Sequence, residues 1–298
     1  MFAVTQYTGF GAARTGTQTG GTATPPNTPT LSDWYDFSDE ATLTTTGTFL
    51  VSAADKSTYS GTASSTVIST FTLYPSYEAA VQNGLGAARF PETWNGSGTD
   101  YQIAARMLQR LGTRSVPPLA GRTVVGVGRY LSLSPSTNLV GPVFAIEAPN
   151  NIGGGFRAIS TTASPSGAIL RMMVIGSSPG AAFAVAEGNL LDRGDWQLYS
   201  ARARLNEGAY IRVDGTQIST TQGTMGTLTI TNFSTGLIIG ADPSLVGVNG
   251  WVGYIGEIRY FESALGTDGV FAEEGYLAWK WGLQGQLPSD HPYKTAPP

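Results

Sequence analysis

Short apolar segments separated by turn signals fill the middle of this chain, and they restrict it to a fold built from β-strands. Between positions 31 and 266, runs rich in Val, Ile, Tyr and Phe alternate with clusters of Gly, Pro, Asp and Ser, which is the pattern of strands joined by turns. The pair Asp214-Gly215 separates the strand-like residues 210–213 and 217–218, and such a pair is a strong β-hairpin signal. We predict an all-β protein whose two antiparallel sheets pack face to face as a jelly-roll sandwich.

The same pattern predicts where the individual strands lie. Each segment contains β-branched or aromatic residues and ends at a cluster of turn-forming residues. We expect strands at residues 122–133, 143–146, 156–159, 169–175, 183–186, 196–205, 209–213, 227–230, 236–239 and 251–261.

Two stretches have a helical pattern instead. Residues 102–111 carry apolar side chains at four-residue spacing, which would place them on one face of a helix. Residues 270–281 have acids in their first turns and a lysine near their end, an order that suits the helix dipole. We expect Thr267 or Asp268 to cap this second helix and Gly282 to end it.

Composition excludes several kinds of chemistry. The chain of 298 residues has no cysteine, so disulfides, thiolate nucleophiles and thiolate zinc sites are ruled out. Its one histidine, His291, excludes multi-histidine metal sites, and we expect this residue to be hydrogen-bonded or at the surface. The net charge of −4 and the absence of a basic run disfavour nucleic-acid binding.

No segment predicts export or membrane insertion. No run of about 18 apolar residues is present, which a membrane-spanning helix would need. Residues 1–10 (MFAVTQYTGF) lack the basic start and the apolar core of a signal peptide. We therefore expect the protein to accumulate in the cytoplasm of the cell that makes it.

Three parts follow one another along the chain. We predict a sandwich at residues 31–266, and a helix with a Pro-rich tail packed on it at residues 267–298. Residues 1–30 form a Gly/Thr/Pro-rich arm, which buries too little to offset the entropy of ordering it alone. We expect contact with another subunit, although the arm could instead cover its own domain. The apolar side chains available for that contact are Phe2, Val4, Tyr7 and Phe10.

The C-terminal residues resemble a recurring ending. Residues 274–283 (EGYLAWKWGL), followed by Leu287-Pro288 and His291-Pro292-Tyr293, are similar to the ending of concanavalin A-like (laminin-G-like) domains in bacteriophage structural proteins and phage-derived bacterial proteins. Weaker similarities occur in the same order at residues 34–39, 42–43, 55–57, 89–90, 98–101, 196, 213–215, 253–258 and 264–265.

This resemblance covers about residues 31–298 and implies a function as well as a fold. It implies a concanavalin A-like jelly roll that serves as a non-enzymatic virion structural protein, either a capsid decoration or a tail-associated surface subunit, and that can also bind host glycans. The implied location is the virion, and the implied partners are other virion proteins and further copies in a homo-oligomer. The alternatives are a carbohydrate-binding receptor-recognition module of a tail fibre and a glycan-cleaving depolymerase.

The distribution of carboxylates argues against the depolymerase. Hydrolysis of a glycosidic bond needs two carboxyl groups about 5–10 Å apart, and two acids at even spacing on a strand would provide them. Glu257 and Glu262 are an odd number of residues apart, so they point to opposite faces of an extended strand, and Glu147 has no acid near it. We expect Glu273 and Glu274 to be solvated on the terminal helix, and we expect no catalytic residue.

Loop residues offer a surface for a sugar. Trp94 and Tyr101 supply aromatic rings near an amide and a carboxylate, and saccharides are held by such combinations because they have apolar faces and polar edges. In the alternative interpretation, Trp94 covers a sheet edge and Asp100 caps its own turn. The candidate ligand-binding residues are Trp94, Asn95, Asp100, Tyr101, Asn249 and Trp251.

No cofactor is expected from these residues. Calcium is a further candidate, because loop carbonyls together with Asp100 or Asp242 supply oxygen ligands of the kind it prefers. No spacing of acids resembles an EF-hand loop, so the sequence assigns no metal site.

Overall fold

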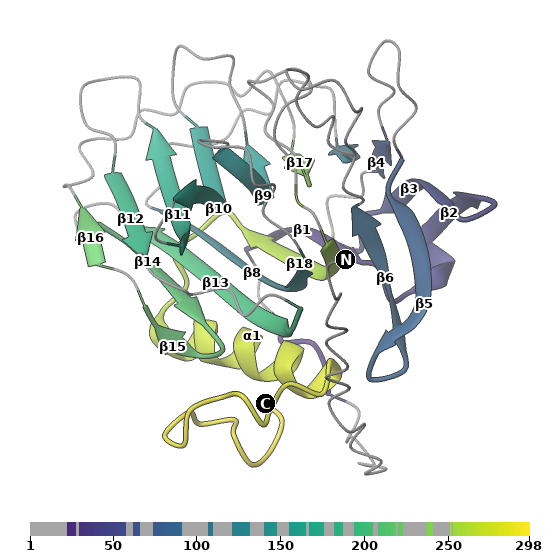
Figure 1. The fold of residues 1–298 in the computed structure, drawn as a ribbon. Coiled ribbons are helices and arrows are strands. Elements are labelled where there is room, and N and C mark those ends of the chain that lie inside the picture. Colours follow the sequence, from purple (N-terminus) through teal and green to yellow (C-terminus); the bar gives the residue numbers. More distant parts are fainter. Residues whose placement is uncertain are drawn as a thin grey trace, which may run out of the picture.

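The computed structural model describes most of the strands and the whole C-terminal region of the chain (Figure 1). Strands predominate in this part, and one α-helix, α1 (Thr267–Lys280), lies near the C-terminus. The described residues are 23–27, 30–57, 62–65, 74–90, 107–109, 121–131, 140–147, 155–164, 167–175, 182–186, 194–204, 208–218, 220–222, 237–240, 251 and 253–298.

The first sheet is built around β18 (Gly253–Phe261). This strand pairs antiparallel with β8 (Gly121–Tyr130) along one side, and with β6 (Leu85–Phe90) and β1 (Leu31–Asp36) along the other. Strand β8 in turn pairs with β13 (Trp196–Arg204) over its whole length. The outer strands are β14 (Gly208–Val213), β15 (Thr216–Gln217) and β5 (Ser76–Gln82).

A second sheet lies behind the first (Figure 1). Its strands also pair antiparallel, in the order β4, β7, β17, β9, β10, β11, β12, β16. The predicted all-β antiparallel sandwich is therefore confirmed. The strands are β4 (Thr62–Ser65), β7 (Met107–Gln109), β9 (Val140–Glu147), β10 (Gly155–Ser164), β11 (Gly167–Ile175), β12 (Ala182–Ala186), β16 (Thr220–Gln222) and β17 (Leu237–Ile239).

A short segment near the N-terminus connects the two sheets. Strand β3 (Phe49–Ala54) pairs with β2 (Leu43–Thr46) and with β4 of the second sheet, and its first residue also pairs with β5 of the first. A single 3₁₀ turn, Glu40–Thr42, precedes β2.

The predicted hairpin at Asp214-Gly215 is confirmed. Strands β14 and β15 pair through Val213 and Thr216, with φ angles of 51° at Asp214 and 76° at Gly215. Positive φ at both central residues is the geometry that makes Asp-Gly favourable in a two-residue hairpin. The same glycine also contacts the tail, because a Cβ built on it would lie 2.9 Å from the Cδ atom of Pro288.

The predicted C-terminal helix is confirmed, but its predicted cap is wrong. Gly266 precedes the first turn and contributes no side-chain cap, while Thr267 and Asp268 are already helical. Asp268 in the first turn instead interacts favourably with the positive end of the helix dipole. Trp281 follows as the C-cap, and Gly282 with φ of 71° ends the helix as expected.

The helix predicted at residues 102–111 is wrong in its described part. Residues 107–109 form β7, which pairs with β4 on one side and β17 on the other. Hydrogen bonding along both edges overrides a helical spacing of apolar residues, because propensity is weak compared with tertiary context. Residues 102–106 and 110–111 lie outside the described residues.

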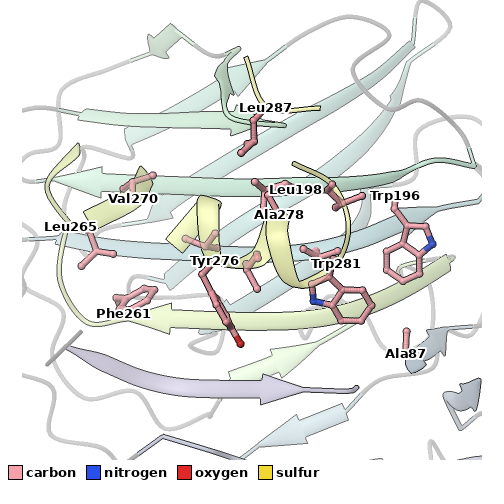
Figure 2. Packing of buried hydrophobic residues seen from close by; sticks show 14 residues of the cluster. Ala87, Trp196, Leu198, Phe261, Leu265, Val270, Tyr276, Ala278, Trp281 and Leu287 are labelled. Carbon is pink, nitrogen blue, oxygen red and sulfur yellow. The ribbon is translucent and has the colours of Figure 1, made fainter. Parts of the chain in front are cut away.

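Helix α1 lies on the outer face of the first sheet and closes part of it (Figure 2). Tyr276, Leu277 and Trp281 are buried there. Trp279 projects from the other side and donates its indole N–H to the carbonyl of Tyr293, 2.8 Å away, so it contacts the tail. The strand residues packed beneath the helix include Ala87, Val125, Val127, Trp196, Leu198 and Phe261.

A one-residue β-bulge interrupts β18. Ile255 pairs with Gly128 and Glu257 with Val127, which leaves Gly256 as an extra residue. Such a bulge shifts the alternation of side chains by one position.

The end of the N-terminal arm lies on its own domain. Arg259 donates from Nη2 to the carbonyl of Pro26 at 3.2 Å, and Ala23 packs against the cluster beneath α1. Residues 23–27 thus follow the alternative in which the arm covers its own sandwich. The apolar residues that were expected to contact another subunit, Phe2, Val4, Tyr7 and Phe10, lie outside the described residues.

Candidate functional site

The two glutamates of α1 are buried, so the expectation that they are solvated is wrong. Glu273 and Arg259 are both 0% exposed, and Arg259 Nε lies 2.7 Å from Glu273 Oε2. The strand β18 projects Arg259 toward the helix, and burial of a carboxylate is tolerated when such a partner is present. Glu273 therefore ties the helix to the sheet.

The Glu274 carboxylate contacts polar side chains of two strands and of the C-terminal tail. Its Oε1 accepts from Ser200 Oγ of β13 at 2.5 Å and from Arg212 Nε of β14 at 2.8 Å. Its Oε2 lies 3.2 Å from His291 Nε2. The backbone N–H of Tyr293 donates to His291 Nδ1, so the histidine is hydrogen-bonded through both ring nitrogens, and this bears out the expectation for it.

Ser200, Glu274 and His291 do not form a catalytic triad. In a triad the histidine lies between the serine and the acid, because it accepts the serine proton. Here the carboxylate lies between the other two, and all three side chains are buried. The arrangement fixes the tail to the sheet, and the serine hydroxyl is bonded to the carboxylate rather than to the histidine.

Glu257 is the centre of a second buried cluster. Its Oε1 accepts from Trp34 Nε1 at 2.7 Å and from the Tyr276 hydroxyl at 3.2 Å, while its Oε2 contacts Lys280 Nζ at 2.6 Å and accepts from Trp281 Nε1 at 3.3 Å. Both carboxylate oxygens are thus occupied by donors from α1, β1 and the helix cap.

Lys280 also joins Glu257 to Asp36. The Nζ atom lies 2.6 Å from Glu257 Oε2 and 2.8 Å from Asp36 Oδ2. Burial acts to raise the pKa of Asp36, but the Lys280 charge and hydrogen bonds from Lys280, Ser38 and Lys56 outweigh it and hold the pKa below its ordinary value. A general acid needs a raised pKa, so Asp36 is unsuited to that role in glycoside hydrolysis.

A row of charged and aromatic side chains crosses the first sheet beyond the end of α1. Register pairs Tyr254 of β18 with Arg89 of β6 on one side and with Arg129 of β8 on the other. Arg129 is in turn paired with Trp196 of β13. We call these four residues the Tyr254 row. Trp196 stacks on Trp281 at the end of α1, with 5.4 Å between ring centroids, so the row begins where the helix stops.

The side chains of the Tyr254 row contact one another. The guanidinium carbons of Arg89 and Arg129 lie 6.0 and 5.9 Å from the Tyr254 ring centroid, within cation–π range. The centroid of Trp196 lies 5.8 Å from that of Tyr254. The Tyr254 hydroxyl donates to Glu78 Oε2 at 2.7 Å, and Glu78 Oε1 lies 2.8 Å from Arg89 Nη1.

Two polar groups of the row have no hydrogen-bond partner in the part of the chain that the structure describes. The Nε atom of Arg129 and the Nε1 atom of Trp196 are both buried and both unpaired. Arg129 also makes no ion pair with any described carboxylate, in contrast to Arg89. Buried donors without partners are uncommon and frequently mark a place where a ligand or water binds.

The structure separates the six predicted ligand-binding residues. Trp251 is 1% exposed, and its ring packs edge-on against Tyr130 and Tyr199, with centroids 5.3 and 6.1 Å away. Trp251 therefore lies in the core and offers no surface to a ligand. Trp94, Asn95, Asp100, Tyr101 and Asn249 lie outside the described residues, and binding by them stays a prediction.

Sequence reasoning missed the Tyr254 row. Its members come from four strands that are far apart along the chain. They are neighbours only because of the order and register in which these strands pair, and neither can be read from the sequence. Trp196 was noted as the start of a strand, but nothing in the sequence placed it beside Tyr254. Even spacing within one strand could not have revealed a site that runs across strands.

Neither a metal-binding cluster nor a helix suited to crossing a membrane occurs among the described residues. No three His, Asp or Glu side chains among the described residues are grouped so that they could hold a metal ion. Asp100 and Asp242, named as calcium ligands, lie outside that part. No helix within the described ranges has the length and apolar character needed to cross a bilayer.

Comparison with known proteins identifies the fold. No protein-family model and no curated protein sequence matches the chain. Among solved structures, the receptor-binding domain of botulinum neurotoxin mosaic serotype C/D matches with a TM-score of 0.52 and 9% identity, over 83% of this chain and 50% of that one. This chain therefore spans about half the length of the toxin domain.

Two smaller proteins match with lower scores. A SAP-like pentraxin from Limulus polyphemus has a TM-score of 0.42 and 14% identity, over 62% of this chain and 80% of its own. The CBM40 domain of Ruminococcus gnavus IT-sialidase has a TM-score of 0.39 and 13% identity, over 64% and 96%. At such identities a match concerns the fold alone. The strand pairing and the terminal helix make the chain an antiparallel β-sandwich of the jelly-roll type with a C-terminal helix, and the toxin match agrees with this fold.

Proposed function

We propose that the chain is a non-enzymatic, carbohydrate-binding surface subunit of a bacteriophage particle that recognises a receptor on the host. The Tyr254 row carries this proposal. It combines an aromatic ring, two guanidinium groups and unpaired donors on a sheet face that α1 leaves uncovered. The toxin neighbour is itself a receptor-binding domain, which is in keeping with this proposal.

An aromatic ring beside charged groups suits a saccharide. Sugar rings have apolar C–H faces that stack on an aromatic ring and hydroxyl edges that need hydrogen-bond partners. Tyr254 supplies the ring and is half-buried, held by its hydrogen bond to Glu78. Arg89 is 46% exposed and Arg129 is partly exposed, so both can donate to hydroxyl groups beside the ring.

The three buried glutamates support binding rather than hydrolysis. Glu257, Glu273 and Glu274 are buried and saturated with donors. A glycosidase needs one carboxyl that is protonated and one that faces the sugar across the bond. None of these three is exposed to a substrate, so the depolymerase is the less favoured alternative.

The phage origin rests on the resemblance of the C-terminal residues. In the fold this ending closes the first sheet: α1 buries Trp281, and the tail is tied to the sheet through His291 and Glu274. A closure of this kind suits a subunit that must persist outside the cell on a particle. A capsid decoration without ligand binding is the second candidate, and it requires contacts with other subunits through residues outside the described part of the chain.

Glycan binding tests the proposal directly. Purified protein should bind saccharides on a glycan array, and Tyr254→Ala should remove that signal. Phe49→Ala is the matched control, because Phe49 is 50% exposed on β3 and lies outside the row. Trp94→Ala measures the contribution of the loop residues predicted from sequence. A silent array would favour decoration, and release of reducing ends from host polysaccharide would overturn the non-enzymatic assignment.

A further inference from the structure

The two arginines that flank Tyr254 differ in how their charge is balanced. Their guanidinium carbons lie almost equally far from the ring, at 6.0 Å for Arg89 and 5.9 Å for Arg129. Arg89 is neutralised by Glu78 at 2.8 Å. Arg129 contacts no carboxylate among the described residues, and its Nε atom is buried without a hydrogen-bond partner.

The acids near Arg129 do not balance its charge. Glu78 is already engaged through both oxygens, by Arg89 and by the Tyr254 hydroxyl. Burial acts to raise the pKa of Glu78, but those two hydrogen bonds outweigh it, so its pKa lies below the ordinary value and the carboxylate stays ionised. Asp195, which precedes Trp196 in the chain, is exposed and makes no ion pair with a described residue.

Trp196, the strand neighbour of Arg129, supplies a second hydrogen-bond donor without an acceptor. It lies directly opposite Arg129 in the β8–β13 pair and is 6% exposed. Its nitrogen points away from the rest of the hydrophobic cluster beneath α1 (Figure 2), and no acceptor reaches it. A partly buried cation and a buried N–H without acceptors together favour a ligand that brings negative oxygen atoms.

We infer that the Tyr254 row binds an acidic saccharide, with the carboxylate of the sugar on Arg129 and the sugar ring on Tyr254. A guanidinium binds a carboxylate through two parallel hydrogen bonds, which are stronger than bonds between neutral groups. Glu78 on the far side of Tyr254 then orients the ligand, because it repels the carboxylate from the Arg89 end of the row. This inference rests on the proposed carbohydrate binding and specifies its ligand class.

Paired probes separate the acidic group from the rest of the sugar. Trigalacturonate, a hyaluronan tetrasaccharide and 3′-sialyllactose are each titrated into the full chain by calorimetry, alongside the same saccharide with its carboxyl groups reduced to alcohols. At least one acidic form should bind about tenfold or more tightly than its reduced form, the loss expected when one charged hydrogen-bond pair is removed.

Arginine variants locate the group responsible. Arg129→Gln should weaken the acidic form to the level of the reduced one, and Arg129→Lys should restore part of the difference, because it keeps the charge but not the paired geometry. Arg89→Gln is the comparison variant: because Glu78 already balances that guanidinium, this variant should weaken the acidic and the reduced form alike and leave the difference between them in place. Circular dichroism verifies that each variant is folded.

Each contrary outcome has a distinct meaning. If the acidic and the reduced form bind equally well, and Tyr254→Ala abolishes the binding of both, then the inference of an acidic ligand is overturned. The proposed carbohydrate binding then stays in place. If Arg89→Gln removes the difference between the acidic and the reduced form as fully as Arg129→Gln does, the difference comes from general charge attraction, and the inference is overturned. Absence of binding to these probes and to every saccharide on the array overturns both proposals.

Discussion

The indole ring of Trp281 lies directly over Gly256. A Cβ atom built on Gly256 would come within 2.4 Å of the Cη2 atom of Trp281, and two further ring carbons would be 2.6 and 2.8 Å away. The C-terminal end of α1 is therefore fitted to the bulge of β18, and hydrogen is the largest substituent that this position accepts in the present packing.

Substitution of Gly256 should destabilise the fold through this contact. Gly256→Ala forces the Trp281 ring, which is buried, to move, and overpacking of this kind costs about 1–3 kcal/mol. Urea denaturation measures the free energy of unfolding. Gly285→Ala is the control, because a Cβ at that position meets no atom within 4 Å, and it should change stability by less than about 0.5 kcal/mol. Equal effects at the two sites would contradict the packing argument.

Removal of one partner from the buried Arg259–Glu273 pair should be costly. Glu273→Gln leaves the Arg259 charge buried without its counter-ion, and such a change costs about 3–5 kcal/mol. Glu78→Gln breaks the exposed pair with Arg89 and should cost less than about 1 kcal/mol. Chemical denaturation of both variants checks the contrast, and a cost for Glu273→Gln no larger than that for Glu78→Gln would mean that the buried pair contributes little.

Stability should depend on pH through Asp36 and its lysines. The pKa of Asp36 lies below its ordinary value of 3.8, so its stabilising effect is complete above that value and is lost as pH falls through the lower pKa of the folded state. Burial acts to lower the pKa of Lys56, but hydrogen bonds and charge from Asp39 and Asp36 outweigh it and raise the pKa above 10.5. The Lys56 contribution is therefore present below 10.5 and is lost as pH rises beyond it.

Asp36→Asn removes the shared carboxylate from this cluster. At pH 7 the variant should be less stable than the wild type, and the difference should shrink as the pH is lowered below the ordinary pKa of aspartate. Thermal denaturation followed over a range of acidic pH values gives both curves. Parallel curves, with a constant difference down to the lowest pH, would show that Asp36 does not titrate as described.

Loss of His291 should release the C-terminal tail. His291→Ala removes one hydrogen-bond partner of buried Glu274 and the ring that contacts Phe271 and Tyr293, at a cost of about 1–3 kcal/mol. Hydrogen exchange of the backbone amides in residues 286–298 should become faster. Asp290→Ala, at the exposed neighbouring position, should leave the exchange unchanged, and faster exchange in that control instead would point to a local effect of the loop.

The sequence predicted most of the described strands after residue 121, and the terminal helix, because both depend on local pattern. It listed none of the seven strands before that position, and the strand expected at 227–230 lies outside the described residues. The Asp214-Gly215 turn fixes its own φ angles, and the apolar face of α1 repeats with the period of a helix. Glu273 and Glu274 were misjudged for a different reason. Their burial depends on Arg259 and Arg212, which reach them from strands that are near only in the folded chain.

The candidate site was harder to predict than the fold. Tyr254 and Trp196 are separated by the length of several strands along the chain, and their contact depends on the order of strands in the sheet. Trp251 was named together with Asn249 as a candidate ligand-binding residue, yet its ring fills the space between Tyr130 and Tyr199. Residue type alone does not distinguish a core aromatic from an exposed one.

The extra residue in β18 reverses which face of the sheet the side chains before it occupy, relative to those after it. Tyr254 and Glu257 are three positions apart and would face opposite ways on a regular strand, but both lie on the side of α1 because Gly256 is inserted between them. A deletion at this one position would turn Tyr254 inward toward the second sheet while Glu257 and Arg259 kept their places. The residues of β18 that contact α1 therefore lie on one side of a single glycine, and the residue that contributes to the proposed binding surface lies on the other. A change at that glycine would displace one group without the other.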